Sequence, residues 1–306
     1  MKRQRGLTIV ELMIAVAIGA LVMLLTVTLL LTSNSGFVAQ AEAAGVDDAG
    51  RFALASIERA AHQSAFVDWE REDMAGGADP ARPPRVRGLD AASLSGAAPA
   101  LGGVRPAAVN GSDILALRSA GAGPGEGDGS MTTCAGFSVG SGQDGWSIFY
   151  VGLNAAGDAE LRCKYKGANN WSAEAVIGGV DSFQVLYGLD TDPVPDGTAN
   201  RYLSATEINA LDSVLELVGA TDEERLRDQM RKTWWKRVAS IKVALVLHGA
   251  KRSRGGSASM FDLFGVAYAN AADAGTHLVT GNMAPALQER ERRAFSATIL
   301  LRNALR

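Results

Sequence analysis

Residues 6–31 read GLTIVELMIAVAIGALVMLLTVTLLL, and this stretch decides the fold class of the chain. Its last twenty residues carry no charged side chain. At a rise of about 1.5 Å per residue, such a helix spans roughly 30 Å, the thickness of a bilayer core. Lys2, Arg3 and Arg5 precede the stretch, so the positive-inside rule predicts that this end stays in the cytoplasm and the rest crosses the membrane.

Glu11 is the exception within this apolar stretch. A charged side chain near the bilayer centre costs on the order of 2–3 kcal/mol, and less near the interface. A conventional secretory signal does not explain the segment, because its apolar core has only about 7–15 residues before a small-residue cleavage site such as Ala39-Gln40-Ala41. A plain membrane anchor has no use for the carboxylate, so a functional partner for Glu11 is expected.

The segment from Arg5 to Met13 resembles the prepilin peptidase site of type IV pilins and type II secretion pseudopilins. That site has a short basic leader ending in Gly, an apolar first mature residue and Glu at mature position five. Gly6, Leu7 and Glu11 match, although the family more often has Phe in place of Leu7. The resemblance implies a leader over residues 1–6, cleavage after Gly6 and N-methylation of Leu7. It also implies that Glu11 pairs with the free amino terminus of a neighbouring subunit.

The helix is expected to continue beyond the membrane. Apolar residues recur at spacings of three and four, which is typical of one helical face: Val46, Ala49, Ala53, Ile57 and Ala60. No proline occurs before Pro80. We therefore predict one helix over residues 7–64, membrane-spanning over about 7–32, followed by a globular domain over residues 65–306.

The remaining chain has the pattern of an α+β domain. Strand-like segments occur at residues 113–118, 137–139, 146–153, 159–165, 183–188, 238–247 and 295–302. Two capping boxes predict helix starts, one formed by Ser204 and Glu207 and the other by Thr221 and Glu224. Residues 76–111 are rich in Gly, Ala and Pro and predict an irregular connection. Strands joined by short turns, with separate helices, favour a mainly antiparallel sheet.

Several blocks of this domain are similar, in order, to the PilW family of minor pilins: residues 111–118, 183–192 with 201–202, 235–245 and 292–303. The resemblance implies a pilin-like fold, with the long helix packed on the sheet. It implies a non-enzymatic type IV pilus subunit that helps to prime assembly and joins a tip complex. The stretch 204–235 looks longer than expected for this family, and its role is open.

The resemblance also implies partners and a location. The expected partners are other minor pilins, the major pilin, the prepilin peptidase and the inner-membrane assembly platform. The helix would sit in the inner membrane with the domain in the periplasm, and the subunit would be extracellular once it is in a pilus.

Two other subunit classes stay open. A type II secretion tip pseudopilin of the J type would share the signal and the architecture. A tip adhesin or DNA-uptake subunit would use the domain to bind a ligand. Nucleic-acid binding is not the main expectation, because the formal net charge is −3. The basic and aromatic segment 231–237 is instead expected to pack at a helix-to-strand junction.

Cys134 and Cys163 are the two cysteines of the chain, and 28 residues lie between them. An even pair in an exported chain predicts a disulfide, and two buried thiols are the alternative. In the chain-entropy model, a loop of this size contributes about 3–4 kcal/mol to stability.

Other motifs carry little chemistry. Asp190, Asp192 and Asp196 lie in one loop and are a calcium candidate, but their spacing departs from an EF-hand, so a solvated acidic turn without a cofactor is the main expectation. The glycines of residues 140–145 match a dinucleotide-binding pattern, but a strand-like segment follows them instead of a helix. We recognise no catalytic triad or phosphate loop in the sequence, which predicts a non-enzymatic protein.

Overall fold

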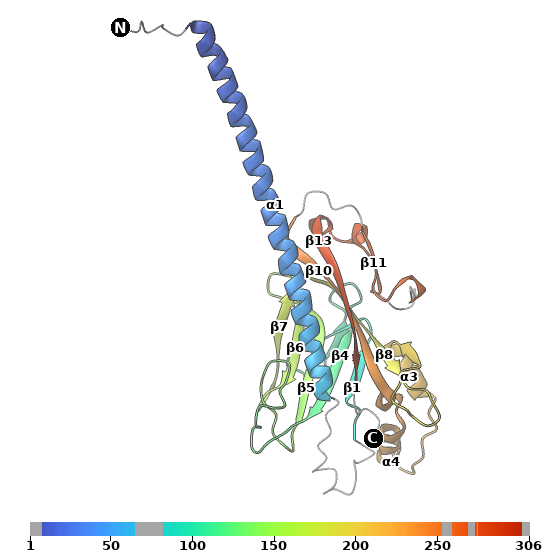
Figure 1. Cartoon of the computed structure of the whole chain (residues 1–306). Helices are drawn as coiled ribbons and strands as arrows, with labels where there is room; N and C mark the ends of the chain where they lie inside the picture. Colours follow the sequence, from blue (N-terminus) through green and yellow to red (C-terminus); the bar gives the residue numbers. More distant parts are fainter. Residues whose placement is uncertain (1–7, 65–81, 253–258, 269–272, 274, 302–306) are drawn as a thin grey trace. The chain divides into compact units, whose positions relative to one another are not determined.

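The computed structural model describes residues 8–64, 82–252, 259–268, 273 and 275–301. The chain divides into two compact units, residues 1–45 and residues 46–306. Helix α1 (Ile9–Ser64) supplies the described structure of the first unit and continues into the second. The second unit also holds the sheets and the shorter helices (Figure 1).

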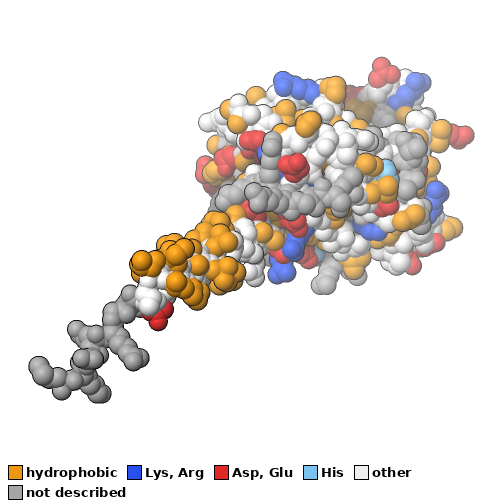
Figure 2. Space-filling view, turned by 90° about the horizontal axis from the view of Figure 1, so that it is seen from above, with side chains coloured by type: hydrophobic (Ala, Val, Ile, Leu, Met, Phe, Trp, Pro, Cys, Tyr) orange, Lys and Arg blue, Asp and Glu red, His pale blue; other side chains and the backbone are white. Residues whose placement is uncertain are grey.

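In the first unit, α1 is a helix with an apolar surface. Its Leu, Ile, Val and Met side chains are exposed, and Figure 2 shows them covering this segment. The hydroxyls of Thr26, Thr28 and Thr32 donate to backbone carbonyls of the preceding turn, so these polar groups have partners without water. The helix is long and apolar enough to cross a membrane.

In the second unit, α1 buries the predicted stripe. Val46, Ala53, Ile57 and Ala60 are buried, and Ala49 packs partly against the same core. This confirms the helical spacing read from the sequence. Asp47, beside the stripe, accepts a hydrogen bond from Arg293 at 2.5 Å.

Two antiparallel sheets make up most of the second unit. The first has the order β1-β4-β5-β6-β7, with bounds Val86–Leu89, Ile114–Ala120, Asp144–Leu153, Ala159–Lys166 and Trp171–Gly178. The second has the order β13-β10-β8-β9, with bounds Arg290–Leu300, Val238–Arg252, Val180–Leu189 and Arg201–Leu203. Every described strand pair in both sheets is antiparallel, as expected for strands joined by short turns.

Smaller elements complete the fold. Two small antiparallel strand pairs are described: β2 (Ala92–Leu94) with β3 (Val104–Pro106), and β11 (Met260–Asp262) with β12 (His277–Val279). The α-helices are α3 (Ala205–Ser213), α4 (Asp222–Lys232) and α5 (Pro285–Gln288). Short 3₁₀ turns are η1 (Trp234–Arg237), η2 (Val266–Tyr268) and η3 (Thr280–Asn282).

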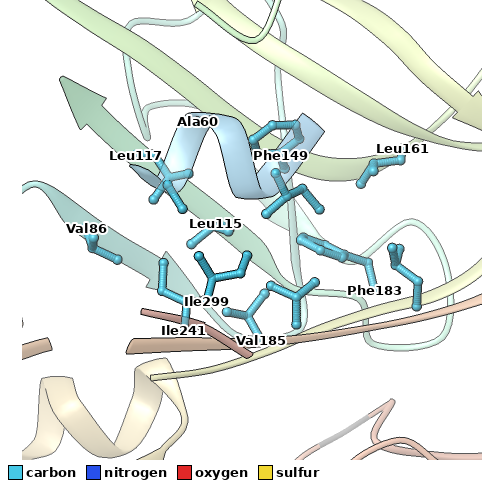
Figure 3. Packing of buried hydrophobic residues seen from close by; sticks show 14 of the residues in the cluster. Ala60, Val86, Leu115, Leu117, Phe149, Leu161, Phe183, Val185, Ile241 and Ile299 are labelled. Carbon is cyan, nitrogen blue, oxygen red and sulfur yellow. The ribbon is translucent and has the colours of Figure 1, made fainter. Parts of the chain in front are cut away.

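The main core lies where α1 meets both sheets (Figure 3). Each layer contributes buried apolar side chains: Ala60 from α1, Leu115, Leu117, Phe149 and Leu161 from the first sheet, and Phe183, Val185, Ile241 and Ile299 from the second. Truncating a buried Phe to Ala typically lowers the free energy of unfolding by about 3–5 kcal/mol. Because α1 and both sheets share this core, its burial stabilises the packing of all three layers.

Three sequence predictions need correction. Residues 76–111 were expected to be irregular, but β1, β2 and β3 lie within this range. Residues 137–139 form no strand, and the pair Thr132–Ser138 makes only an isolated bridge. The last strand begins at Arg290 and not at Phe295, because β13 pairs with nearly the whole of β10. The α+β class and the mainly antiparallel pairing are as predicted.

Candidate functional site

The first turn of α1 is closed by Thr8 and Glu11. The backbone N–H and the hydroxyl of Thr8 both donate to Oε2 of Glu11, each at 2.9 Å. The backbone N–H of Glu11 in turn donates to Thr8 Oγ1 at 3.3 Å. This is the reciprocal arrangement of a capping box, which satisfies backbone donors that the start of a helix leaves unpaired. Gly6 and Leu7 lie outside the described residues.

This geometry leaves one carboxylate oxygen of Glu11 able to accept a further hydrogen bond. Glu11 is exposed, and both hydrogen bonds from Thr8 converge on Oε2. Among the described residues, Oε1 makes no hydrogen bond. The capping box therefore fixes the carboxylate in position while one oxygen can still meet a cationic group.

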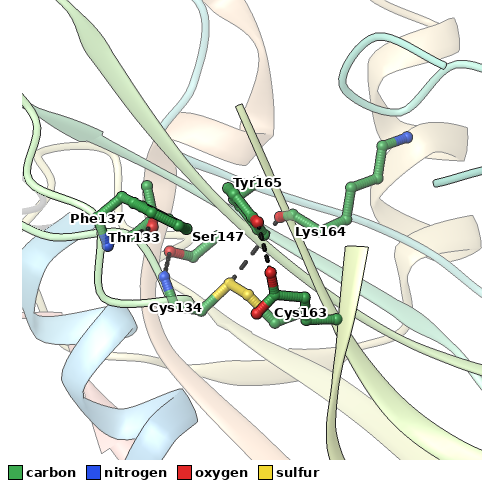
Figure 4. The surroundings of a disulfide bond; sticks show 8 residues. Thr133, Cys134, Phe137, Ser147, Cys163, Lys164 and Tyr165 are labelled. Atoms are coloured by element: carbon green, nitrogen blue, oxygen red, sulfur yellow. Dashed lines mark hydrogen bonds between the residues drawn. A yellow bond between two sulfur atoms is a disulfide. The ribbon is translucent and has the colours of Figure 1, made fainter. Parts of the chain in front are cut away.

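A disulfide joins Cys134, in the loop before β5, to Cys163 on β6 (Figure 4). The backbone N–H of Cys134 donates to Ser147 Oγ at 2.9 Å, which fixes the loop to β5 as well. The ring of Phe137 stacks on Tyr165 with 5.1 Å between centroids. The loop is thus fastened to the face of the first sheet that carries Cys163.

The acidic loop after β8 is organised by a single buried carboxylate. Asp190 accepts backbone N–H groups from Asp192 at 3.0 Å and from Asp196 and Gly197 at 2.8 Å. Burial by itself raises the pKa of Asp190, but these three donors outweigh it and lower the pKa below its usual value.

The calcium candidate stays a prediction. One carboxylate oxygen from each of Asp190, Asp192 and Asp196 lies within 4.8 Å of the other two. The backbone donors already account for the position of Asp190, so the loop geometry has an explanation that needs no cation.

The two capping boxes predicted in residues 204–235 are present. Ser204 with Glu207 opens α3, and Thr221 with Glu224 opens α4. The prediction that segment 231–237 packs at a helix-to-strand junction is also confirmed.

Trp235 shows how that junction is built. Its ring is buried, and its Nε1 donates to Asn209 Oδ1 at 2.9 Å. It also meets Tyr187 edge-on, with ring centroids 4.8 Å apart. The guanidinium of Arg237 lies 5.1 Å from the ring of Trp234. These aromatic residues are therefore engaged within the domain.

The sequence did not predict a buried ionic cluster that the structure contains. Asp181 Oδ1 lies 3.0 Å from His248 Nδ1, and Arg292 Nε donates to Asp181 Oδ2 at 2.7 Å. The three side chains are 2%, 7% and 4% exposed, in the order Asp181, His248 and Arg292. They come from β8, β10 and β13, so the cluster ties together three neighbouring strands. No spacing in the sequence could have signalled it.

Comparison with known proteins adds three findings. Residues 148–303, just over half of the chain, match the family described as Type IV Pilus-assembly protein W, and residues 1–27 match the Prokaryotic N-terminal methylation motif. No curated protein matches the chain. Among solved structures, the Type IV-like pilin TTHA1219 from Thermus thermophilus is similar at 15% identity and a TM-score of 0.34, covering 72% of this chain and 87% of that chain.

Proposed function

The chain belongs to the PilW family of type IV pilus-assembly proteins, and from this premise we propose that it is a minor pilin that helps to prime pilus assembly and joins the complex at the pilus tip. The family is a structural, non-enzymatic class of pilin. The prepilin-like motif and the apolar helix indicate a membrane-anchored subunit.

The proposed maturation follows the N-terminal motif. A prepilin peptidase cleaves after Gly6, and the new amino group of Leu7 is methylated. Before assembly, α1 holds the subunit in the inner membrane with its globular unit in the periplasm. The assembly platform and other pilins then draw it into the fibre, where it becomes extracellular. The motif match over residues 1–27 supports this sequence of events.

The proposed assembly mechanism depends on the position of Glu11. It stands at the start of a helix whose next twenty residues bear no charge, and one of its carboxylate oxygens is engaged by Thr8. A carboxylate enclosed among packed apolar helices is costly unless a cation pairs with it. The amino terminus of a neighbouring mature subunit supplies that cation, so the pair sets the register of the incoming subunit.

Substituting Glu11 tests this role. In a strain that depends on this chain for piliation, Glu11→Gln keeps the size of the side chain but removes its charge, and we expect a marked loss of surface pili at unchanged protein level. Glu58→Gln is the matched control, because Glu58 is an exposed carboxylate on the same helix outside the apolar span. Normal piliation in the Glu11→Gln strain would overturn the assembly role.

A deletion strain separates the pilus from a secretion pseudopilus. We expect loss of pili with normal export of type II secretion substrates. Loss of export with normal pili would replace the minor-pilin proposal by the pseudopilin alternative.

A further inference from the structure

A cleft of about 550 Å³ opens on the first sheet, beside the β2–β3 hairpin. Its walls come from β2, β3, β5, β6 and β7, and they include Ser93, Ser95, Arg105, Tyr150, Arg162 and Trp171. The buried cluster next to it is separate from the main core and contains Leu94, Ile148 and Tyr150. The cleft therefore lies on the face of the sheet opposite the disulfide and α1.

Strand β6 presents a charged row to this face. Alternate residues of a strand point to one side, which places Glu160, Arg162, Lys164 and Lys166 together. Figure 4 shows the Lys164 side chain pointing away from the disulfide of the adjacent Cys163. Because β6 is an interior strand with β5 and β7 on either side, these charges stand over the sheet surface one strand from its β7 edge.

In this row the positively charged side chains outnumber the negatively charged ones. Arg162 pairs with Glu160 at 3.0 Å, and its Nη2 donates to Ala173 O at 3.1 Å, but its buried Nε has no partner among the described residues. Lys164 is fully buried, and its Nζ likewise has no hydrogen-bond partner in the described part of the chain. Lys164 Nζ lies 5.6 Å from the centroid of the Trp171 ring.

Burying a cation without a counter-charge is unfavourable, so Lys164, which does not itself line the cleft but lies beside the cleft residue Trp171, favours an anion in this region. Arg105 adds another positive group at the rim. None of the described residues that line the cleft is acidic, and Glu160, which lies outside this lining, pairs with Arg162. The electrostatic field of this face therefore favours an anionic ligand.

We propose that this cleft binds a carboxylate-bearing sugar. A guanidinium matches a carboxylate through two parallel N–H donors, which the exposed Arg105 can supply, whereas Arg162 is held in the cleft wall by Glu160 and Ala173. Trp171 and Tyr150 provide flat apolar surface, and the Tyr150 and serine hydroxyls suit a ligand rich in hydroxyl groups. Concave sites with apolar walls and a few polar groups are typical of small-molecule binding, and a volume of about 550 Å³ falls within their usual range.

The architecture of the cleft argues against an inorganic phosphate as its ligand. Phosphate sites commonly use the backbone N–H groups of a helix start or a concave turn. The cleft walls consist of strands and a hairpin loop, with their backbone donors largely engaged in sheet pairing. The side chains, not the backbone, would recognise the ligand.

Binding to the full-length protein in detergent micelles tests the proposal. The probes are D-glucuronate and its neutral counterpart D-glucose, titrated calorimetrically at low salt. We expect saturable binding of glucuronate, at least about tenfold tighter than that of glucose. Glucose lacks the carboxylate, and an about tenfold weaker affinity is what the loss of one charge-assisted contact predicts. Arg105→Gln, an exposed position, should weaken glucuronate binding severalfold. Arg201→Gln, exposed on β9 of the other sheet, should leave it unchanged.

Several results would overturn the proposal. Equal affinity for the two sugars, or no binding of either, would remove the acidic sugar as ligand. Tighter binding of inorganic phosphate or of acetyl-Asp-Glu-Asp-amide would assign the cleft to another chemistry. An unchanged affinity in Arg105→Gln would place the sugar elsewhere on the protein. The comparison of the two sugars uses the unaltered chain, so it holds even where a variant fails to fold.

Discussion

Glu11 Oε2 accepts two hydrogen bonds from Thr8, one from its backbone N–H and one from its hydroxyl, each 2.9 Å long. The hydroxyl bond requires a side chain with an oxygen at position 8. Thr8→Val removes it while keeping the branched shape, and loss of an N-cap hydroxyl typically costs about 1 kcal/mol. We expect fewer pili in a Thr8→Val strain, because the carboxylate is less well positioned, and near-normal numbers in Thr8→Ser.

Counting surface pili by electron microscopy checks this expectation, with immunoblots to show equal subunit levels. Equal piliation in Thr8→Val and Thr8→Ser would mean that the capping hydroxyl has no part in positioning Glu11.

The disulfide should account for much of the stability of the globular unit. Cys134 and Cys163 are 29 positions apart, and closing a loop of that length contributes about 3–4 kcal/mol in the chain-entropy model. The Cys134→Ser/Cys163→Ser double variant should lose about that much free energy of unfolding in a urea titration. Dithiothreitol should destabilise the parent protein and leave the double variant unaffected. A reductant effect of equal size in both would assign the stabilisation to another cause.

Gly88 on β1 allows a close approach between the two sheets. A Cβ at this position would lie 1.8 Å from the hydroxyl oxygen of Tyr187 on β8 and 2.9 Å from the carbonyl oxygen of Ile114. Gly88→Ala should therefore lower the free energy of unfolding, by about 1–3 kcal/mol as for other overpacked cores.

Two further variants sharpen the test of Gly88. Adding Tyr187→Phe removes the nearest atom, so the Gly88→Ala/Tyr187→Phe pair should recover part of the loss. Gly178→Ala is the matched control, because a Cβ there meets nothing within 4 Å. Equal effects at positions 88 and 178 would rule out the steric explanation.

The sequence carried the features that act locally. The uncharged run after Glu11, the stripe from Val46 to Ala60 and the capping boxes at Ser204 and Thr221 depend on residues three or four apart. Such patterns are visible in a single chain because the neighbours that satisfy them are close in sequence. Each of these elements is found where the pattern placed it.

Features that depend on distant partners were missed. Strands β2 and β3 have only three residues each and lie in a Gly- and Pro-rich segment, and β2 pairs with β3 across a nine-residue loop. Side chains of β2 are buried only because they pack against the first sheet. The ionic cluster joins Asp181 to Arg292, which are 111 positions apart, so no local spacing predicts it. The cleft beside Trp171 combines five strands and is equally invisible in the sequence.

Lys164 should make stability depend on pH in the alkaline range. Burial lowers the pKa of Lys164 from its ordinary value of 10.5 to about 8. Between these two pH values the unfolded chain keeps the proton that the folded chain has lost, so the unfolded state binds more protons. The contribution of Lys164 to the free energy of unfolding therefore rises with pH across this window. At pH 7 the folded state must instead hold a buried ammonium group, which lowers its stability.

Lys164→Met removes this charge while keeping a long apolar side chain, so the variant should be more stable than the parent at pH 7. Because the parent gains stability above pH 8, the difference should shrink steadily as the pH approaches 10.5. Urea unfolding of both proteins across this range measures the difference. Lys166→Met, at an exposed position on the same face of β6, controls for the loss of a positive charge and should differ little from the parent. A difference for Lys164→Met that stays constant with pH would mean that the lysine does not release its proton in this window.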